Sequence, residues 1–173
     1  MSVVDLRTKI REVADFPTPG VGFKDITPLL ADHGALTQAI GQLAEWVRGK
    51  QPDLILGAEA RGFILGAAVA AEAGCGFVPA RRPGKLPPET VSASYVLEYG
   101  ENALEVHPGL IPEGARVVIH DDVLATGGTV DAIRGLVDRL GGEVVGSCFI
   151  IELTFLGGRE RLAGRDVHAL VSY

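Results

Sequence analysis

The stretch Val117-Val-Ile-His-Asp-Asp-Val-Leu-Ala-Thr-Gly-Gly-Thr-Val130 decides the fold of this chain. It opens with apolar, β-branched residues, which are typical of a buried strand about five residues long. Asp121 and Asp122 follow where we expect this strand to end, and a loop of Gly and Thr comes next. Apolar residues then recur at helical spacing from Thr129 to Leu140. The order strand, acidic pair, glycine-rich loop and helix is one unit of an α/β fold.

The loop between this strand and helix is suited to a phosphate group. Gly127 and Gly128 let the backbone turn sharply and approach a ligand closely. The free N–H groups at the start of the helix favour an anion. Asp121 and Asp122 cannot bind phosphate, but they suit ribose hydroxyls or a hydrated Mg²⁺ carried by the ligand. A phosphorylated ribose is therefore the predicted ligand, and an ordinary strand-to-helix turn is the alternative.

Other features of the sequence narrow the class of protein. The pattern G-x-x-x-x-G-K-[ST] of nucleoside-triphosphate P-loops is absent. The net charge of −6 and the pI near 5.2 argue against a nucleic-acid or membrane-surface protein. No apolar run is long enough to cross a bilayer, and no secretory signal opens the chain. Cys75 and Cys148 suggest neither a disulfide nor a metal site. We expect one cytoplasmic domain over residues 1–173.

Strand and helix patterns alternate along most of the chain. Helices are expected around Leu6–Val13, Gly34–Arg48, Phe63–Ala73 and Arg159–Leu162, and strands at Leu54–Gly57, Phe77–Ala80, Val144–Ile151 and Val167–Val171. This alternation predicts a parallel sheet with helices on both faces. Ligands of such sheets bind beyond the carboxyl ends of the strands. Glu59–Gly62 and Asp121–Thr129 should therefore lie at the same edge.

Residues 81–107 interrupt the alternation. Two strands are expected at Val91–Tyr99 and Ala103–His107, joined at Gly100–Asn102. We interpret this inserted hairpin as a lid over the site. Glu98 on the lid could handle a proton there, although a lone Glu on such a strand is often a plain edge carboxylate.

Two basic segments add positive charge near the predicted edge. Arg61 follows Glu59-Ala60 at a strand end, where it could grip a second phosphate with exposed backbone amides. A surface turn is the alternative, and a strained or cis peptide bond is expected between Glu59 and Ala60. Arg81 and Lys85 lie on a stiff, proline-rich loop. They form either a solvated basic face or a site for a pyrophosphate leaving group.

Assembled, these segments make the chain resemble the adenine phosphoribosyltransferases, a type I phosphoribosyltransferase family, almost end to end. The acidic pair and Gly-Gly-Thr are shared by many phosphoribosyltransferases. More selective segments are Asp15–Gly20, Phe23–Pro28 and Ser94–Gly100, and further matches are Glu59–Phe63, Gly84–Pro87 and Glu152–Leu153. The resemblance implies a single-domain type I phosphoribosyltransferase fold, with a central parallel sheet, flanking helices and an inserted β-hairpin lid.

The resemblance also implies a reaction and its site residues. The reaction is transfer of the phosphoribosyl group from 5-phosphoribosyl-1-diphosphate to adenine, with Mg²⁺, giving AMP and pyrophosphate in purine salvage. The 5′-phosphate would lie on Ala125, Thr126, Gly127, Gly128 and Thr129, and the ribose and Mg²⁺ on Asp121 and Asp122. The pyrophosphate would lie on Glu59, Ala60, Arg61, Arg81 and Lys85, with Arg61 counted as catalytic. Adenine would lie on Gly22, Phe23 and Lys24, within an N-terminal segment 1–34.

Further expectations concern the lid and the assembly. Glu98 would be the acid/base near the purine, with Tyr99 beside it. Arg81 would reach into the partner's site of a homodimer. Gly22 stands where the family has a larger apolar residue, so base stacking is looser or supplied by Phe23 or Leu156. His120 replaces an aliphatic residue, and strand alternation points it away from Asp121.

Two rival functions remain open from the sequence. A hypoxanthine, guanine or xanthine phosphoribosyltransferase would share the donor site and read a different base. A non-catalytic regulator could keep this fold and sense phosphoribosyl diphosphate, but it would need an added nucleic-acid-binding segment or a basic face. This acidic chain shows neither.

Overall fold

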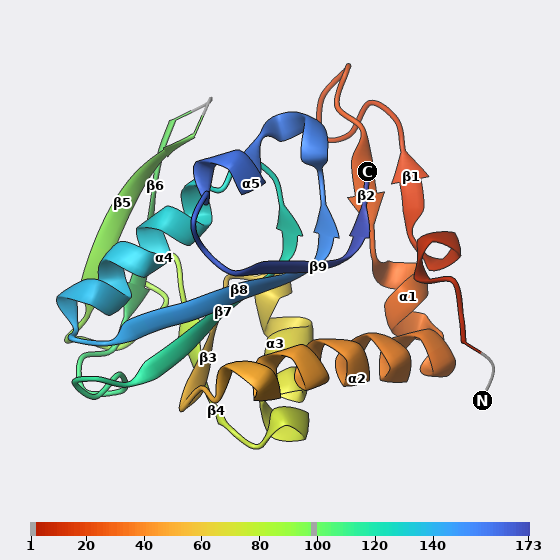
Figure 1. Ribbon diagram of the computed structural model, residues 1–173. Coiled ribbons are helices and arrows are strands. Elements are labelled where there is room, and N and C mark those ends of the chain that lie inside the picture. The colour runs from red at the N-terminus through yellow and green to blue at the C-terminus, as the bar shows by residue number, and fades with distance from the viewer. Residues whose placement is uncertain (1–2, 98–99) are drawn as a thin grey trace.

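A five-stranded parallel sheet forms the centre of the molecule (Figure 1). The computed structural model describes residues 3–97 and 100–173, with the backbone alone at 95–97 and 100–102. The strands lie in the order β4 (Gly76–Ala80), β3 (Leu54–Ala58), β7 (Arg116–Leu124), β8 (Glu143–Glu152) and β9 (Val167–Ser172). All four neighbouring pairs run parallel, which confirms the predicted sheet.

Helices cover both faces of this sheet. Strand alternation directs Ile55 and Val118 to the face that packs against α2 (His33–Lys50) and α3 (Arg61–Ala73). It directs Leu56 and Ile119 to the other face, against α4 (Gly128–Arg139). All four side chains are fully buried. Because such burial contributes roughly 25 cal/mol per Å² of apolar surface, these two cores fix the register of the sheet.

The inserted hairpin consists of β5 (Val91–Leu97) and β6 (Gly100–Val106). It packs along α4, where the Arg139 guanidinium donates to the carbonyl of Ser92. Leu97 pairs with Gly100, so Gly100–Asn102 belong to β6. The turn predicted at those three residues is therefore wrong, because they pair with β5 instead of connecting the strands.

The N-terminal segment differs from its predicted helix. Only Leu6–Lys9 are helical, as the 3₁₀ turn η1, and Arg11–Val13 form β1 against β2 (Phe23–Asp25). The Arg11 side chain holds this pairing by donating from Nε to Asp25 at 3.1 Å. The remaining short elements are α1 (Thr27–Ala31), η2 (Thr154–Leu156) and α5 (Gly158–Arg161).

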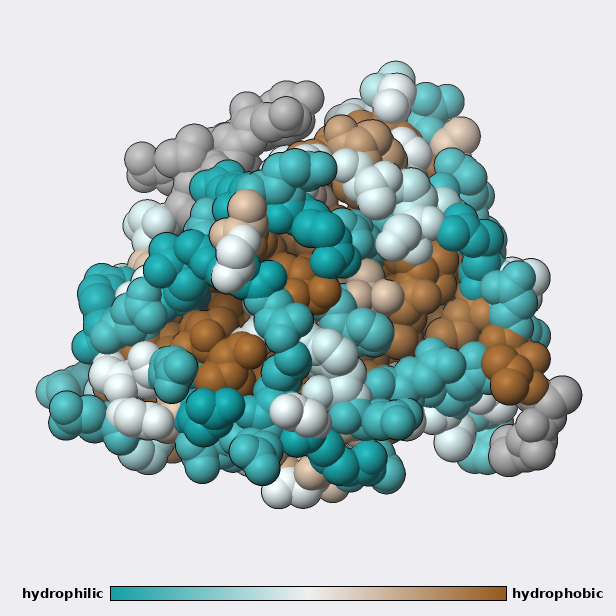
Figure 2. All heavy atoms as spheres, viewed as in Figure 1, coloured by the Kyte–Doolittle hydropathy of each residue, from teal (hydrophilic) through white to brown (hydrophobic). Residues whose placement is uncertain are grey.

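The β1–β2 ribbon, η2 and α5 all lie above the sheet in Figure 1, with the hairpin at the side. Figure 2 shows hydrophobic atoms exposed at the top of this view, where η2 and the ribbon come together. Phe16, Val21, Phe155 and Leu156 are exposed large apolar residues of these segments. Over the described ranges, no helix has the length and apolar character needed to span a bilayer.

Candidate active site

The phosphate loop, Ala125–Thr129, connects β7 to α4 as predicted. Gly127 has φ +81°, a left-handed conformation that a residue with a Cβ adopts at a cost. Helix α4 begins directly after it at Gly128, and no side chain caps that helix start in the part of the chain described. The first N–H groups of α4 therefore remain available, which suits an anionic ligand.

The acidic pair lies within β7 instead of at its end. Strand β7 continues to Leu124 because Val123 and Leu124 still pair with β8. The shorter strand expected from the sequence is thus wrong, since polar residues can continue a strand whose backbone remains paired. Asp122 is 2% exposed, whereas Asp121 is half-buried. Burial, followed by the charge of Asp122, raises the pKa of Asp121 well above its usual value.

Arg61 joins this acidic pair from the start of α3. Its Nε donates to Oδ2 of Asp122, and its side chain remains half-exposed. Burial alone would lower the pKa of Arg61, but the hydrogen bond and charge of Asp122 raise it overall, so the cation persists. The peptide bond between Glu59 and Ala60, just before α3, is cis, as predicted. Arg61 and Asp122 are therefore close enough to act on one ligand.

The predicted pyrophosphate loop is anchored by Glu59. The Glu59 carboxylate, 6% exposed, accepts from Nε of Arg81 at 3.2 Å and from the backbone N–H of Arg82 at 2.8 Å. Burial would raise the pKa of Glu59, but these donors lower it overall. Arg81 also donates to the carbonyl of Lys85 at 3.4 Å. The Glu59 side chain thus holds the basic loop in position, while its predicted role at the pyrophosphate stays a prediction.

The predicted adenine residues lie on β2 and just before it. Phe23 packs edge-to-face on Phe16, with ring centroids 5.2 Å apart, and the Arg61 guanidinium carbon lies 5.4 Å from the Phe23 centroid. Lys24 is paired with Glu12 at 3.0 Å and is only 10% exposed. Arg61 therefore contacts the base segment as well as Asp122. The structure brings the predicted ribose, pyrophosphate and adenine residues together at one edge of the sheet.

Known proteins match this chain over its whole length. The family model for the phosphoribosyl transferase domain matches residues 29–167. An adenine phosphoribosyltransferase of Desulfitobacterium hafniense is 53% identical over 173 residues, which is 100% of both chains. The chain belongs to the adenine phosphoribosyltransferase family.

Solved structures of this family share the fold. The crystal structure of the Thermoanaerobacter pseudethanolicus enzyme is 51% identical, with a TM-score of 0.94 and 98% of each chain covered. The Trypanosoma brucei enzyme, in complex with AMP, pyrophosphate and ribose-5-phosphate, is 27% identical with a TM-score of 0.88. That match covers 96% of this chain and 77% of the other. The family and the type I fold expected from the sequence are confirmed.

The two residues predicted to act from the lid, Glu98 and Tyr99, fall outside the part of the chain that the structure describes. The base of the hairpin is fixed on α4, the helix that starts at the phosphate loop. The roles of Glu98 and Tyr99 remain predictions.

The sequence did not reveal how the segment after β8 supports the phosphate loop. An ideal Cβ on Gly158 would lie 2.2 Å from the carbonyl oxygen of Ala125, so α5 rests directly against the loop. Arg159 fixes this segment by donating to both oxygens of Glu152, at 2.8 and 2.6 Å. The only sequence signal was the Gly-Gly pair at 157–158, which permits a close backbone approach.

Strand alternation places His120 on the face of β7 opposite to Asp121 and on the same face as Asp122. It is fully buried, and its Nδ1 donates to the carbonyl of Cys148 at 3.0 Å. Its Nε2 is buried without a hydrogen-bond partner in the described structure. Burial lowers the pKa of His120 to about 4, so the ring is neutral at pH 7.

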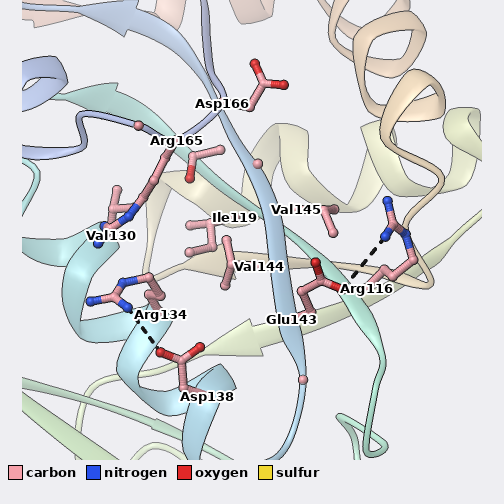
Figure 3. A pocket seen from close by; sticks show the side chains of 14 residues that line it. Arg116, Ile119, Val130, Arg134, Asp138, Glu143, Val144, Val145, Arg165 and Asp166 are labelled. Carbon is pink, nitrogen blue, oxygen red and sulfur yellow. Dashed lines mark hydrogen bonds and ion pairs between the residues drawn. The ribbon is translucent and has the colours of Figure 1, made fainter.

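A separate cavity of about 570 Å³ lies between α4 and β8, away from the acidic pair (Figure 3). Four of its charged side chains form two ion pairs across the lining. Arg134 contacts Asp138 at 3.2 Å, and Arg116 contacts Glu143 at 3.8 Å. None of the predicted site residues within the described part of the chain line this cavity, so it is not the candidate active site.

Proposed function

We infer that this protein transfers the phosphoribosyl group of 5-phosphoribosyl-1-diphosphate to adenine, releasing AMP and pyrophosphate. The observation that carries this inference is the convergence at one sheet edge of Asp122, Arg61 and Phe23. Relatives of the same length, about half identical, bear the name of this activity. A different purine is the rival substrate, and the named relatives favour adenine.

Different residues of the chain bind the 5′-phosphate, the ribose and the pyrophosphate of the donor. The free N–H groups at the start of α4 hold the 5′-phosphate, and the carboxylates of Asp121 and Asp122 orient the ribose hydroxyls. Arg61 stands beside Asp122, where it neutralises charge on the departing pyrophosphate. As the bond from the ribose C1 to the pyrophosphate oxygen breaks, a ring nitrogen of adenine forms the new bond through an oxocarbenium-like centre.

The acidic pair fits a metal that arrives with the substrate. The described residues contain no group of three or more acidic, His or Cys side chains that could hold an ion alone. Mg²⁺ needs only one or two carboxylates when waters and substrate oxygens complete its shell. Asp121 and Asp122 would hold such an ion, which when bound would neutralise charge on the diphosphate.

We further propose that Glu98 exchanges a proton with the purine and that the lid excludes water during transfer. Glu98→Gln should lower the rate of the chemical step by about 100-fold, the usual contribution of general acid–base catalysis. Single-turnover measurements would show this. A full rate in that variant, with chemistry shown to be limiting, would remove Glu98 from the mechanism.

We also propose a homodimer in the cytoplasm. Arg82 is exposed and Arg81 half-buried on the loop anchored by Glu59, and a second chain that approached this loop could receive Arg81. Cys75 and Cys148 are free thiols, as is usual in a reducing compartment. Light scattering would test the dimer. If Arg81 serves the neighbouring site, mixing an Arg81→Ala chain with an Asp122→Asn chain should restore part of the activity.

A purine panel tests the function itself. Adenine, hypoxanthine, guanine and xanthine would each be supplied with the diphosphate donor and Mg²⁺, and nucleotide formation measured. We expect AMP formation to exceed the others by at least about 100-fold, because a purine site that pairs with the amino group rejects oxo purines strongly. Faster turnover of another purine would make that purine the substrate. No turnover of any base would favour a donor-sensing regulator.

A further inference from the structure

The phosphate loop contains no cation of its own. Ala125–Thr129 consists of Ala, Thr and Gly, whereas a phosphate monoester carries about two negative charges near pH 7. Asp131 adds a further negative charge in the first turn of α4, where its N–H donates to the carbonyl of Gly127 at 3.1 Å. An electrostatically balanced site therefore needs positive charge from another element.

Arg161 of α5 lies directly against this loop. An ideal Cβ on Gly127 would lie 3.4 Å from Cδ of Arg161 and 3.2 Å from the carbonyl oxygen of Gly158. The aliphatic stem of Arg161 thus fills the space that a larger residue would occupy at position 127. Its Nε donates to Oδ2 of Asp131 at 2.7 Å, and its side chain is 49% exposed. The guanidinium is therefore fixed beside the loop and still open to solvent.

Asp131 is held by arginines on both carboxylate oxygens. Arg165, which lines the cavity shown in Figure 3, donates to Oδ1 of Asp131 at 2.8 Å. Nε of Arg134 lies 3.9 Å from the same oxygen. Burial would raise the pKa of Asp131, but the hydrogen bonds from Arg165 and Arg161 lower it overall. The carboxylate is thus ionised and fully occupied, so it orients Arg161 while its own charge is cancelled.

Arg159, the other α5 cation, is already engaged elsewhere. It donates to both oxygens of Glu152 and to the carbonyl of Val167 at 2.9 Å. These bonds tie α5 to the ends of β8 and β9 and leave Arg161 as the α5 cation that faces α4. The two arginines therefore have separate tasks, one fixing the segment and one supplying charge at the loop.

We infer that Arg161, oriented by Asp131, helps to bind the donor's 5′-phosphate: it packs behind Gly127 and supplies the positive charge that the loop lacks. This inference rests on the proposed function, because it takes the loop to hold the 5′-phosphate. It assigns to α5 a part in donor recognition that the phosphate-loop sequence does not contain.

The test is a comparison of Arg161→Gln with Arg165→Gln. Both variants lose one charge and one hydrogen bond to Asp131, but only the first loses a guanidinium whose stem packs on Gly127 of the phosphate loop. Steady-state kinetics would give KM for the diphosphate donor and for adenine, and calorimetry would give Kd for AMP and for adenosine. Adenosine lacks the 5′-phosphate and so reports on everything else in the site.

Arg161→Gln should raise the donor KM and the AMP Kd by roughly ten-fold, the usual cost of one charged hydrogen bond. The adenine KM, the adenosine Kd and kcat should change by less than about two-fold, because the interaction is not with the base. Arg165→Gln should produce a clearly smaller change, and Arg161→Lys should recover most of the lost affinity because it restores the charge.

Three outcomes would overturn the inference. These are equal effects of the two Gln variants, a parallel rise in the adenine KM and the adenosine Kd, or no recovery in Arg161→Lys. Should Arg161→Gln fail to fold, Arg161→Met keeps the stem packed on Gly127 and takes its place. Failure of the proposed function is distinguishable, because wild-type protein would then form no AMP whatever the variants bind.

Discussion

The central strand of the five-stranded sheet carries Asp121 and Asp122, and the phosphate loop follows it directly. By contrast, Phe23 and Lys24 lie on a ribbon of two three-residue strands. We call the first group the donor half of the site and the second the base half. The donor half rests on two buried cores and on backbone pairing through Leu124. The base half is tied down by side chains, through Lys24–Glu12 and through aromatic contacts of Phe23.

Under the proposed function, the two substrates would meet parts of the protein that are held in place by different interactions. A pyrophosphate-bearing donor needs fixed charges and backbone amides, which a sheet edge provides before the ligand arrives. A planar base needs a surface of complementary shape and a few polar contacts, which a short two-stranded ribbon can supply. Changes in the donor half should therefore have large, donor-specific effects, and changes in the base half smaller, base-specific ones.

The largest effect is expected from Asp122→Asn. This change removes a buried carboxylate and leaves the Arg61 guanidinium without its partner. Because this carboxylate orients both the ribose and Arg61, kcat/KM for the donor should fall by at least about 100-fold, the usual loss when one preorganised charged group of a site is removed. Steady-state kinetics at several Mg²⁺ concentrations would measure it. Asp138→Asn, an exposed carboxylate on α4, is the matched control. Wild-type donor kinetics in Asp122→Asn would refute the assignment.

A second large effect should appear in the pH dependence of stability. His120 lies in the core beneath the donor half, and burial lowers its pKa to about 4 from an ordinary value near 6.5. The unfolded chain thus binds the proton more tightly. Stability is fully present above about pH 6.5 and is lost as the pH falls toward 4, by about 2–3 kcal/mol at pH 4.5.

His120→Val should remove this part of the pH dependence and also the unpaired Nε2. Urea unfolding at pH 7 and pH 4.5 would measure the difference between variant and wild type, with exposed His33→Gln as the control. The same slope in His120→Val and wild type would mean that His120 does not control the acid sensitivity of the core.

Gly158→Ala should weaken donor binding through the backbone of the loop. The added methyl would lie 2.2 Å from the carbonyl oxygen of Ala125, so α5 or the loop must shift. We expect a loss of about 1–3 kcal/mol in the free energy of unfolding, with a raised donor KM and an unchanged adenine KM. Gly49→Ala, with nothing within 4 Å of its new methyl, should instead gain about 0.5–1 kcal/mol. Equal effects at both positions would show that the contact with Ala125 does not matter.

The smallest effect concerns the base half. The Tyr173 ring lies 4.0 Å from Nζ of Lys24 and 4.4 Å from the Arg7 guanidinium. Tyr173→Ala should raise the adenine KM by about two- to five-fold, the cost of one cation–π contact of about 0.5–1 kcal/mol, and leave the donor KM unchanged. Arg7→Gln spares the Lys24 contact and serves as the control. A donor-specific effect of Tyr173→Ala would remove the distinction between the two halves.

The donor half could largely be predicted from the sequence because its chemistry is local. The acidic pair, the loop and the helix start lie within one short stretch, and the parallel sheet then brings Arg61 to the same edge. The base half and its supports could not be predicted in the same way. Lys24 meets Tyr173 from the far end of the chain, and Arg161 meets Gly127 through a fold of the backbone that short spacing does not reveal.

The predicted ends of helices and strands were wrong where backbone pairing with another strand outweighed the local pattern of apolar and polar residues. Apolar spacing favoured a helix through Val13, but Arg11–Val13 pair with β2. Polarity favoured a strand end before Asp121, but the ladder with β8 continues to Leu124. In both cases a second strand supplies the hydrogen bonds, and the residues of the first strand alone do not indicate that partner.

Arg61 contacts both Asp122 and Phe23, so it connects the donor half of the site with the base half. A donor that draws the guanidinium toward its diphosphate also changes the surface on which Phe23 faces the incoming purine. Entry of the two substrates should therefore follow a preferred sequence, donor first, so that adenine meets a compartment already shaped for it.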